Sequence, residues 1–156
     1  MASRIHYAMY LRRAVPDDMH EIASIHRTAR AVAVPWLPVV HTAQDGLWFF
    51  TKRVLPVQQV YVVRIAEKIV GFAAHHEGWL NHLYIDAGYW RQGLGGLLLV
   101  KAQSVNDTLQ LWTFARNLAA QAFYARAGFQ IVEHTDGRDN EERTPDVRMR
   151  WAKSDH

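Results

Sequence analysis

The chain has 156 residues, of which 49% are hydrophobic, and 18 lysine and arginine residues against 15 acidic residues give a formal net charge of +3. This length and balance predict one globular domain over residues 1–156 and exclude a disordered chain. Because the chain has no cysteine, disulfides, thiolate catalysis and thiolate metal sites are excluded.

Targeting signals do not stand out in the sequence. The longest apolar run, residues 31–40, contains two prolines and is too short to span a bilayer. The N-terminus lacks an apolar run of signal-peptide length. We therefore expect a cytoplasmic protein without a membrane partner. Its basic residues are scattered, so the charge by itself does not favour a nucleic-acid partner, and we expect none.

The first third of the chain predicts a strand and two helices. Residues 7–15 have strand character, and Asp17 or Asp18 can cap the helix that follows. The apolar positions of that helix are Met19, Ile22, Ile25 and Ala29. Residues 31–41 predict a loop, and residues 42–55 predict a second helix. The aromatic residues here belong either to the core or to a substrate pocket.

The middle of the chain predicts a strand hairpin followed by a strand, a loop and a helix. Residues 57–66 and 69–77 form the expected hairpin. Residues 79–85 predict a third strand of this region. The glycine-rich segment 91–96 follows, and the helix after it extends to about Val105.

The last third predicts three strands and one helix. Residues 109–114 predict a strand and residues 117–127 a helix. Residues 129–134 and 147–151 predict two final strands, separated by a polar, acidic and mobile loop at 135–146. The resulting order, βααβββαβαββ, predicts the α/β (α+β) class, with a mixed sheet of about seven strands and about four helices.

The glycine-rich segment is the first functional signal. A strand that leads through such a loop into a helix points unpaired backbone N–H groups at an anion. Gly93, Gly95 and Gly96 remove side chains that would keep a phosphate away. A dinucleotide-binding loop would need a third glycine where Leu98 stands, and a P-loop would need a following Lys-Ser or Lys-Thr pair. A phosphate site of another kind is favoured, with a turn that binds no ligand as the alternative.

Two segments resemble motifs of the GNAT family of acetyl-CoA-dependent N-acetyltransferases. Residues 90–95, WRQGLG, are similar to the family's [QR]-x-x-G-x-[GA] loop, although Trp90 stands where Gln or Arg is usual. Residues 117–129, NLAAQAFYARAGF, are similar to its N-x-x-A-x-x-[FL]-Y-x-x-x-G-F segment. The resemblance covers residues 7–151. It implies the GNAT acyl-CoA N-acyltransferase fold and acetyl-CoA as co-substrate.

The resemblance also implies a set of cofactor contacts. These are Leu83, Tyr84, Ile85, Arg91, Gln92, Gly93, Leu94, Gly95, Gly96, Asn117 and Phe123. The strand would pair with the pantetheine arm, and the loop would hold the pyrophosphate. For Asn117 a helix N-cap is the other interpretation, and for Phe123 it is core packing.

The chemistry of acetyl transfer needs a proton donor for the thiolate, an oxyanion donor and a neutral amine. Tyr124 matches the family's general acid, and the amide of Leu83 could polarise the thioester carbonyl. Some family members carry a glutamate base where Trp79 stands here. Candidate bases are His82, which is preferred, then Glu77, His75 and His76, unless water relays the proton. No metal motif is present among the nine histidines.

The acceptor is expected to be a primary amine of a small molecule or peptide. Its pocket should form from residues 31–55 and 135–146, where Glu141, Glu142 and Asp146 could attract a cationic amine. Apolar residues in these regions are compatible with a homodimer. The alternative function is a non-catalytic acyl-CoA-binding or regulatory module. Such a module would bind acetyl-CoA but would release no free thiol in the presence of any amine.

Overall fold

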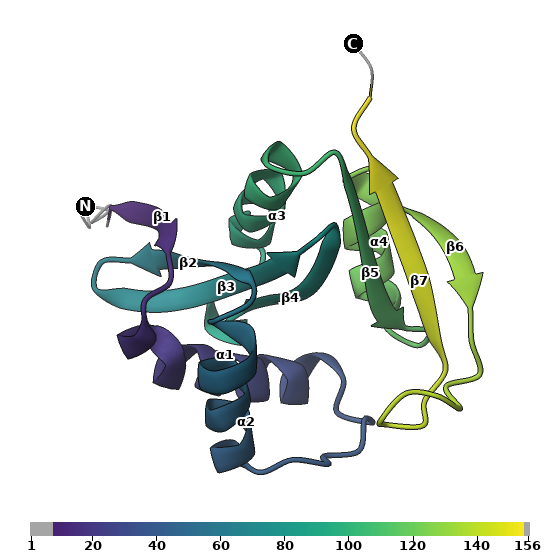
Figure 1. Cartoon of the computed structure of the whole chain (residues 1–156), viewed down its shortest axis with the longest axis horizontal. Helices are drawn as coiled ribbons and strands as arrows, with labels where there is room; N and C mark the ends of the chain where they lie inside the picture. The colour runs from purple at the N-terminus through teal and green to yellow at the C-terminus, as the bar shows by residue number, and fades with distance from the viewer. Residues whose placement is uncertain (1–7, 155–156) are drawn as a thin grey trace, which may run out of the picture.

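In the computed structural model, which describes residues 8–154, helices flank one mixed sheet (Figure 1). The elements are β1 (Met9–Arg13), α1 (Met19–Ala33), α2 (Ala43–Phe49), β2 (Gln59–Ile65), β3 (Lys68–His76), β4 (Trp79–Ile85), α3 (Leu94–Ser104), β5 (Thr108–Phe114), α4 (Leu118–Arg126), β6 (Gln130–His134) and β7 (Asp146–Ala152). Their order and the mixed α/β class confirm the prediction. The first strand is shorter than predicted, and Tyr7 lies outside the described residues.

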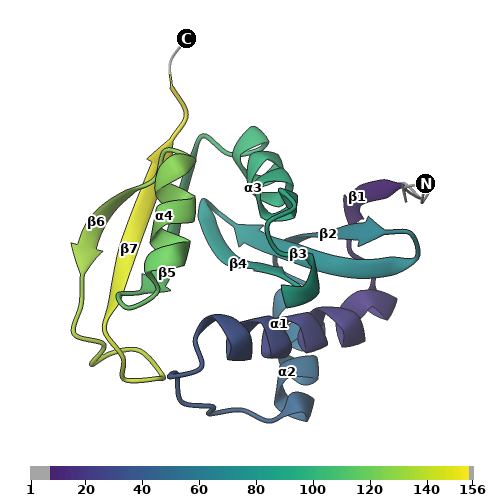
Figure 2. The ribbon, with the colours of Figure 1, turned by 180° about the vertical axis from the view of Figure 1, so that it is seen from behind.

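The sheet has two halves that meet at a single point. Its strand order is β1-β2-β3-β4-β5-β7-β6, and only β4 and β5 run parallel. These two strands share one residue pair, Trp79 with Gln110, and the Gln110 N–H donates to the Gly78 carbonyl at 2.8 Å. Beyond that pair the strands diverge, as the view from behind shows (Figure 2). The divergence leaves an opening in the middle of the sheet.

Two apolar clusters hold the layers together, one on each face of the sheet. One lies under α3 and includes Leu98, Leu109 and Phe129. The other lies under α1 and includes Phe50 and Phe72. Helix α1 contributes the four apolar positions predicted from its sequence, Met19, Ile22, Ile25 and Ala29, all of which are buried. Burial of this stripe fixes α1 across the N-terminal half of the sheet.

The second helix begins where its sequence predicts. The Thr42 hydroxyl accepts the Asp45 N–H at 3.1 Å, and the Asp45 carboxylate accepts the Thr42 N–H at 2.9 Å. This reciprocal cap starts α2, which continues as a π-helical segment, Phe50–Val54. Helix α1 runs three residues into the predicted loop before it ends at Ala33. No helix within residues 8–154 is long and apolar enough to cross a membrane.

Polar side chains of the β6–β7 loop hydrogen-bond within the loop. The Thr135 hydroxyl hydrogen-bonds to the Asp146 carboxylate. Asn140 donates to the Thr144 carbonyl at 2.6 Å and accepts the Thr144 N–H at 3.0 Å. Side chains that suggested solvent exposure thus satisfy part of the loop's own backbone.

Candidate functional site

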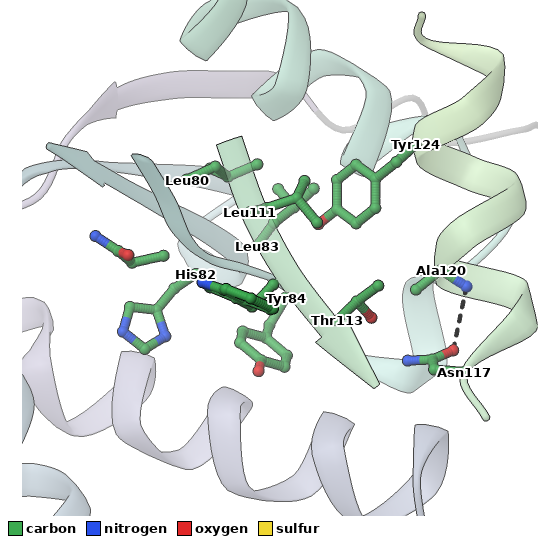
Figure 3. A pocket seen from close by; sticks show the side chains of 11 residues that line it. Leu80, His82, Leu83, Tyr84, Leu111, Thr113, Asn117, Ala120 and Tyr124 are labelled. Carbon is green, nitrogen blue, oxygen red and sulfur yellow. Dashed lines mark hydrogen bonds between the residues drawn. The ribbon is translucent and has the colours of Figure 1, made fainter. Parts of the chain in front are cut away.

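A pocket opens where β4 and β5 diverge, with α4 as its outer wall (Figure 3). Its lining residues are Leu80, Asn81, His82, Leu83, Tyr84, Leu111, Trp112, Thr113, Asn117, Ala120 and Tyr124. Most come from the two diverging strands. The pocket therefore exists because the sheet is split, and the residues predicted on the fourth strand and the last helix meet there.

The edge of β4 that faces the pocket carries free backbone groups. The Asp86 N–H donates to the Val70 carbonyl of β3 at 2.8 Å. Backbone direction alternates along a strand, so Leu83 and Ile85 turn their N–H and C=O groups the other way, toward β5. Because β5 has already diverged, these groups are open to an extended ligand lying as an added strand.

Trp90 contacts the end of this edge. Its indole Nε1 donates to the Ile85 carbonyl at 2.6 Å. The residue that departs from the family's usual Gln or Arg therefore covers a backbone acceptor on the β4 edge.

The glycine-rich loop ends in an exposed helix start. Arg91 and Gly93 both have positive φ, 65° and 80°, and Gly93 is the N-cap of α3. The first intrahelical bond runs from the Leu97 N–H to the Gly93 carbonyl at 3.2 Å. The N–H groups before Leu97 consequently have no partner inside the helix. Open space surrounds Gly96, so an anion can approach these groups directly.

Gly95 has a packing role. A Cβ at this position would lie 3.3 Å from the Phe123 ring. Its hydrogen permits close packing of α3 against α4, while its backbone N–H is among those without a partner inside the helix. Phe123 in turn packs on the core under α3 and does not line the pocket. The core interpretation of Phe123 is the one that its contacts support.

Asn117 caps α4 at the pocket wall. Its Oδ1 accepts the Ala120 N–H at 3.1 Å, drawn as the dashed line in Figure 3. The side chain also lines the pocket. The cap engages Oδ1, which leaves the Nδ2 amino group as the donor available to a ligand. The capping and binding roles are therefore compatible.

Tyr124 and His82 reach the pocket from opposite sides of the split sheet. In Figure 3 the Tyr124 phenol points from α4 toward Leu83 and Leu111. His82 and Tyr84 extend the other way, toward α1. Burial, and then the nearby Tyr84 hydroxyl, raise the pKa of Tyr124 well above its usual value. Tyr124 is therefore protonated throughout the physiological range and can act as a donor.

His82 sits in an aromatic environment with His26 of α1. The two imidazole centroids are 5.7 Å apart, and the Phe50 ring lies 5.1 Å from His82. The His82 Nδ1 is buried without a hydrogen-bond partner among the described residues. Burial, followed by His26 and Arg30, lowers the pKa of His82 to about 3. Burial and then Arg30 lower the pKa of His26 to about 4, so both rings are neutral near pH 7.

The other candidate bases lie outside the pocket. Glu77 is in the tight β3–β4 turn, where its φ is 49°, and its side chain is 81% exposed. His76 pairs with it at 3.7 Å. His75 turns to the α3 face, where its Nδ1 lies 3.4 Å from the Asn106 amide and its ring stacks on Tyr61. Strand alternation, with a bulge after Ala74, carries all three away from the lining of the pocket.

The acidic residues predicted to attract an amine are already paired. Glu142 accepts from the Arg30 guanidinium at 2.6 Å, and its side chain is only 11% exposed. Glu141 contacts His41 at 2.5 Å. Asp146 accepts from Thr135 and Asn140. A carboxylate that has a cationic partner attracts a second cation weakly, which applies to Glu142 beside Arg30.

The sequence interpretation missed the residues that α1 brings to the site. His26 contacts the Tyr84 ring at 4.8 Å. Arg30, four residues later, lies over Phe114 of β5 at 5.8 Å. Their i, i+4 spacing on the border of the apolar stripe was the available signal, since such positions face a neighbouring element.

Comparison with known proteins supports the same assignment. A family model described as an acetyltransferase (GNAT) domain matches residues 56–131. An uncharacterized N-acetyltransferase of Escherichia coli (strain K12), YafP, is 27% identical over 128 residues, covering 79% of this chain and 82% of its own. The segment matched by the family model contains β4, β5 and α4, which line the pocket, and the glycine-rich loop.

Solved structures share the fold along nearly the whole chain. The apo form of YjaB from Escherichia coli has a TM-score of 0.75 at 20% identity, covering 94% of this chain and 99% of that one. The PaiA N-acetyltransferase of Thermoplasma acidophilum, solved in complex with coenzyme A, has a TM-score of 0.76 at 14% identity, with coverage of 94% and 99%. At these identities the likeness concerns the fold. By the family match and the two motifs, this chain is similar to the GNAT acetyltransferases, which use acetyl-CoA as the acetyl donor.

Proposed function

We propose that this domain transfers the acetyl group of acetyl-CoA directly to a primary amine of a small molecule or peptide, with Tyr124 as general acid. The observation that carries the proposal is the pocket between β4 and β5. It has a free strand edge on one side, a protonated phenol on another and a helix start nearby. An acyl carrier with an extended arm and a pyrophosphate fits these three features.

The binding part of the proposal uses backbone groups. The pantetheine arm would pair with Leu83 and Ile85, and the pyrophosphate would lie on the N–H groups of segment 91–96. Asn117 would donate from Nδ2. With the thioester in the opening of the sheet, the Leu83 N–H would stabilise the oxyanion that forms on its carbonyl.

In the proposed reaction, the amine attacks from one face of the sheet and the sulfur leaves toward the other face. The amine would enter from the side of His82 and attack the carbonyl carbon, forming the C–N bond. The C–S bond then breaks, and the Tyr124 hydroxyl protonates the leaving sulfur. The proton lost by the amine returns to the Tyr124 phenolate through His82 or water, so the products are the acetamide and the free thiol of CoA.

The low pKa of His82 limits its role in this scheme. A ring with a pKa of about 3 cannot deprotonate an alkylammonium before attack. It can accept a proton only in passing, from the far more acidic nitrogen of the addition intermediate. The acceptor must therefore reach the pocket as the neutral amine, and the pH dependence of the rate should follow the acceptor.

The test combines two measurements on the full chain. Titration calorimetry with acetyl-CoA and CoA measures binding, and release of free thiol with a broad amine panel measures transfer. Binding together with acceptor-dependent thiol release, and an N-acetylated product by mass spectrometry, is expected. Absence of CoA binding by the folded protein would refute the proposal.

A further inference from the structure

The open end of the split sheet is closed by the α1–α2 connection, residues 34–42. In both views this connection reaches the β6–β7 loop (Figure 1, Figure 2). Trp36 from the connection packs edge-to-face on Phe114 of β5, with ring centroids 6.0 Å apart. Arg116, which follows β5, lies over the Trp36 ring with its guanidinium 4.3 Å from the ring centroid. Phe114 and Arg116 are the chain neighbours of Thr113 and Asn117, which line the pocket, so an aromatic pair with a cation on it lies beside the pocket.

Two arginines enclose this aromatic pair, but only one has a carboxylate partner. Arg30 lies over Phe114 at 5.8 Å and is paired with Glu142. Arg116 forms no ion pair within the part of the chain that the structure describes, residues 8–154. Its guanidinium is held in place by the stack on Trp36, so its charge is fixed in position and not neutralised.

The electrostatic consequence is a guanidinium on the acceptor side that has no carboxylate partner. Glu142 is matched by Arg30, Asp146 is held by the neutral donors Thr135 and Asn140, and the imidazoles of His26 and His82 are neutral. Arg116 is thus the cation that is available to an anion here. Such a site disfavours a second cation on the acceptor and favours an anion, for which a guanidinium offers two parallel N–H donors.

We propose that the acceptor is a primary amine with an apolar or aromatic body that also carries a carboxylate or phosphate, and that Arg116, stacked on Trp36, binds this anionic group. This inference rests on the proposed acetyl transfer and adds the class of acceptor to it. The body of the acceptor would lie along Trp36 and Phe114, with its amine directed toward His82. Arg116 is one residue before Asn117 of the pocket wall, so the anion site and the pocket are contiguous.

Matched acceptors give the direct test. Phenylalanine and phenylalanine amide differ only in the anionic group, and phosphoserine amide and serine amide test a phosphate in the same way. Thiol release should give a kcat/KM, calculated on the concentration of neutral amine, at least about 10-fold higher for the anionic member, mainly through KM, as expected for a charge-assisted bidentate contact. Equal values, or a preference for the amide or for a diamine, would overturn the proposal.

Arg116→Gln should abolish the preference between the members of a pair. Arg150→Gln is the matched control, because Arg150 is an exposed arginine on β7 at the end of the strand away from Phe114, and the net charge changes equally. Arg116→Lys should recover part of the preference, since it keeps the charge but loses the fork geometry. A preference that survives Arg116→Gln would refute the assignment to Arg116.

A second readout needs no turnover. Titration of CoA-loaded protein with 3-phenylpropionate and with 3-phenylpropanamide compares anion and amide binding directly. Only the carboxylate should bind, and Arg116→Gln should remove that binding. If CoA binds but the two probes behave alike, the acceptor class is wrong while acetyl transfer stands. If CoA itself fails to bind, it is the proposed function that fails.

Discussion

The two sides of the split sheet are built from different materials. The proposed cofactor side, formed by the β4 edge and the loop at 91–96, presents mainly backbone N–H and C=O groups. The proposed acceptor side, formed by His26, His82, Trp36 and Arg116, presents side chains. Backbone groups are the same for every residue, so the cofactor side can stay constant while the acceptor side changes its specificity.

The largest expected effect comes from Tyr124, the proposed general acid. Tyr124→Phe removes the phenolic proton but keeps the ring that packs on Phe129. We expect kcat to fall by about 10² to 10⁴, the range for a lost general acid, with CoA affinity unchanged by calorimetry. Tyr61→Phe, on the α3 face away from the pocket, is the control. An unchanged kcat would show that sulfur takes its proton from elsewhere.

A negative charge on the glycine-rich loop should weaken CoA binding without affecting the acceptor side. Gly96→Asp places a carboxylate in the first turn of α3, where it favours the helix dipole but repels a pyrophosphate. We expect CoA to bind about 10 to 100 times more weakly, with thermal stability maintained. Gly46→Asp is the matched control, because a Cβ at either glycine meets nothing within 4 Å. Equal CoA affinity in the two variants would remove segment 91–96 from the binding site.

The acceptor side should carry the pH dependence of stability. The pKa values of His26 and His82 lie below the 6.5 of the unfolded chain, at about 4 and about 3. Between pH 6.5 and about 4 the unfolded chain therefore binds more protons, and the free energy of unfolding falls as the pH falls. Each ring contributes at most about 1.4 kcal/mol per pH unit, and less where water reaches it.

Urea denaturation at a series of pH values measures this slope. His26→Phe should flatten it, whereas the same change at His20, an exposed position of α1, should not. In the same pH range the acetylation rate should rise with the fraction of neutral amine. A plot of this rate against pH should show no inflection near pH 6.5, where an exposed histidine titrates. A rate inflection near pH 6.5 that His82→Phe abolishes would contradict the neutral, buried ring.

The smallest expected effect concerns the hydrogen bond between the Trp90 indole and the end of β4. The Trp90 indole occupies the Ile85 carbonyl, which a pantetheine arm paired along β4 would also approach. Trp90→Phe keeps an aromatic ring but removes the competing donor, so CoA should bind a few-fold more tightly. Weaker binding would instead identify Trp90 as part of the wall that holds the arm.

The sequence by itself determined the order of the elements and the cofactor side. Periodicity predicted all seven strands and the buried face of α1, because these patterns depend on neighbours close in the chain. The glycine-rich loop and the segment at 117–129 were found for the same reason, since each is a short local motif. The family resemblance predicted that both segments contact the same cofactor.

Only the tertiary structure decided the acceptor side. Glu77, His75 and His76 were candidates by residue type, yet a turn and a strand bulge direct them away from the pocket. Glu141 and Glu142 suggested a cation site until α1 and the α1–α2 connection supplied Arg30 and His41 as partners. These pairs join residues about one hundred positions apart in the sequence. No local pattern encodes such a meeting, because it depends on how the chain closes around the split sheet.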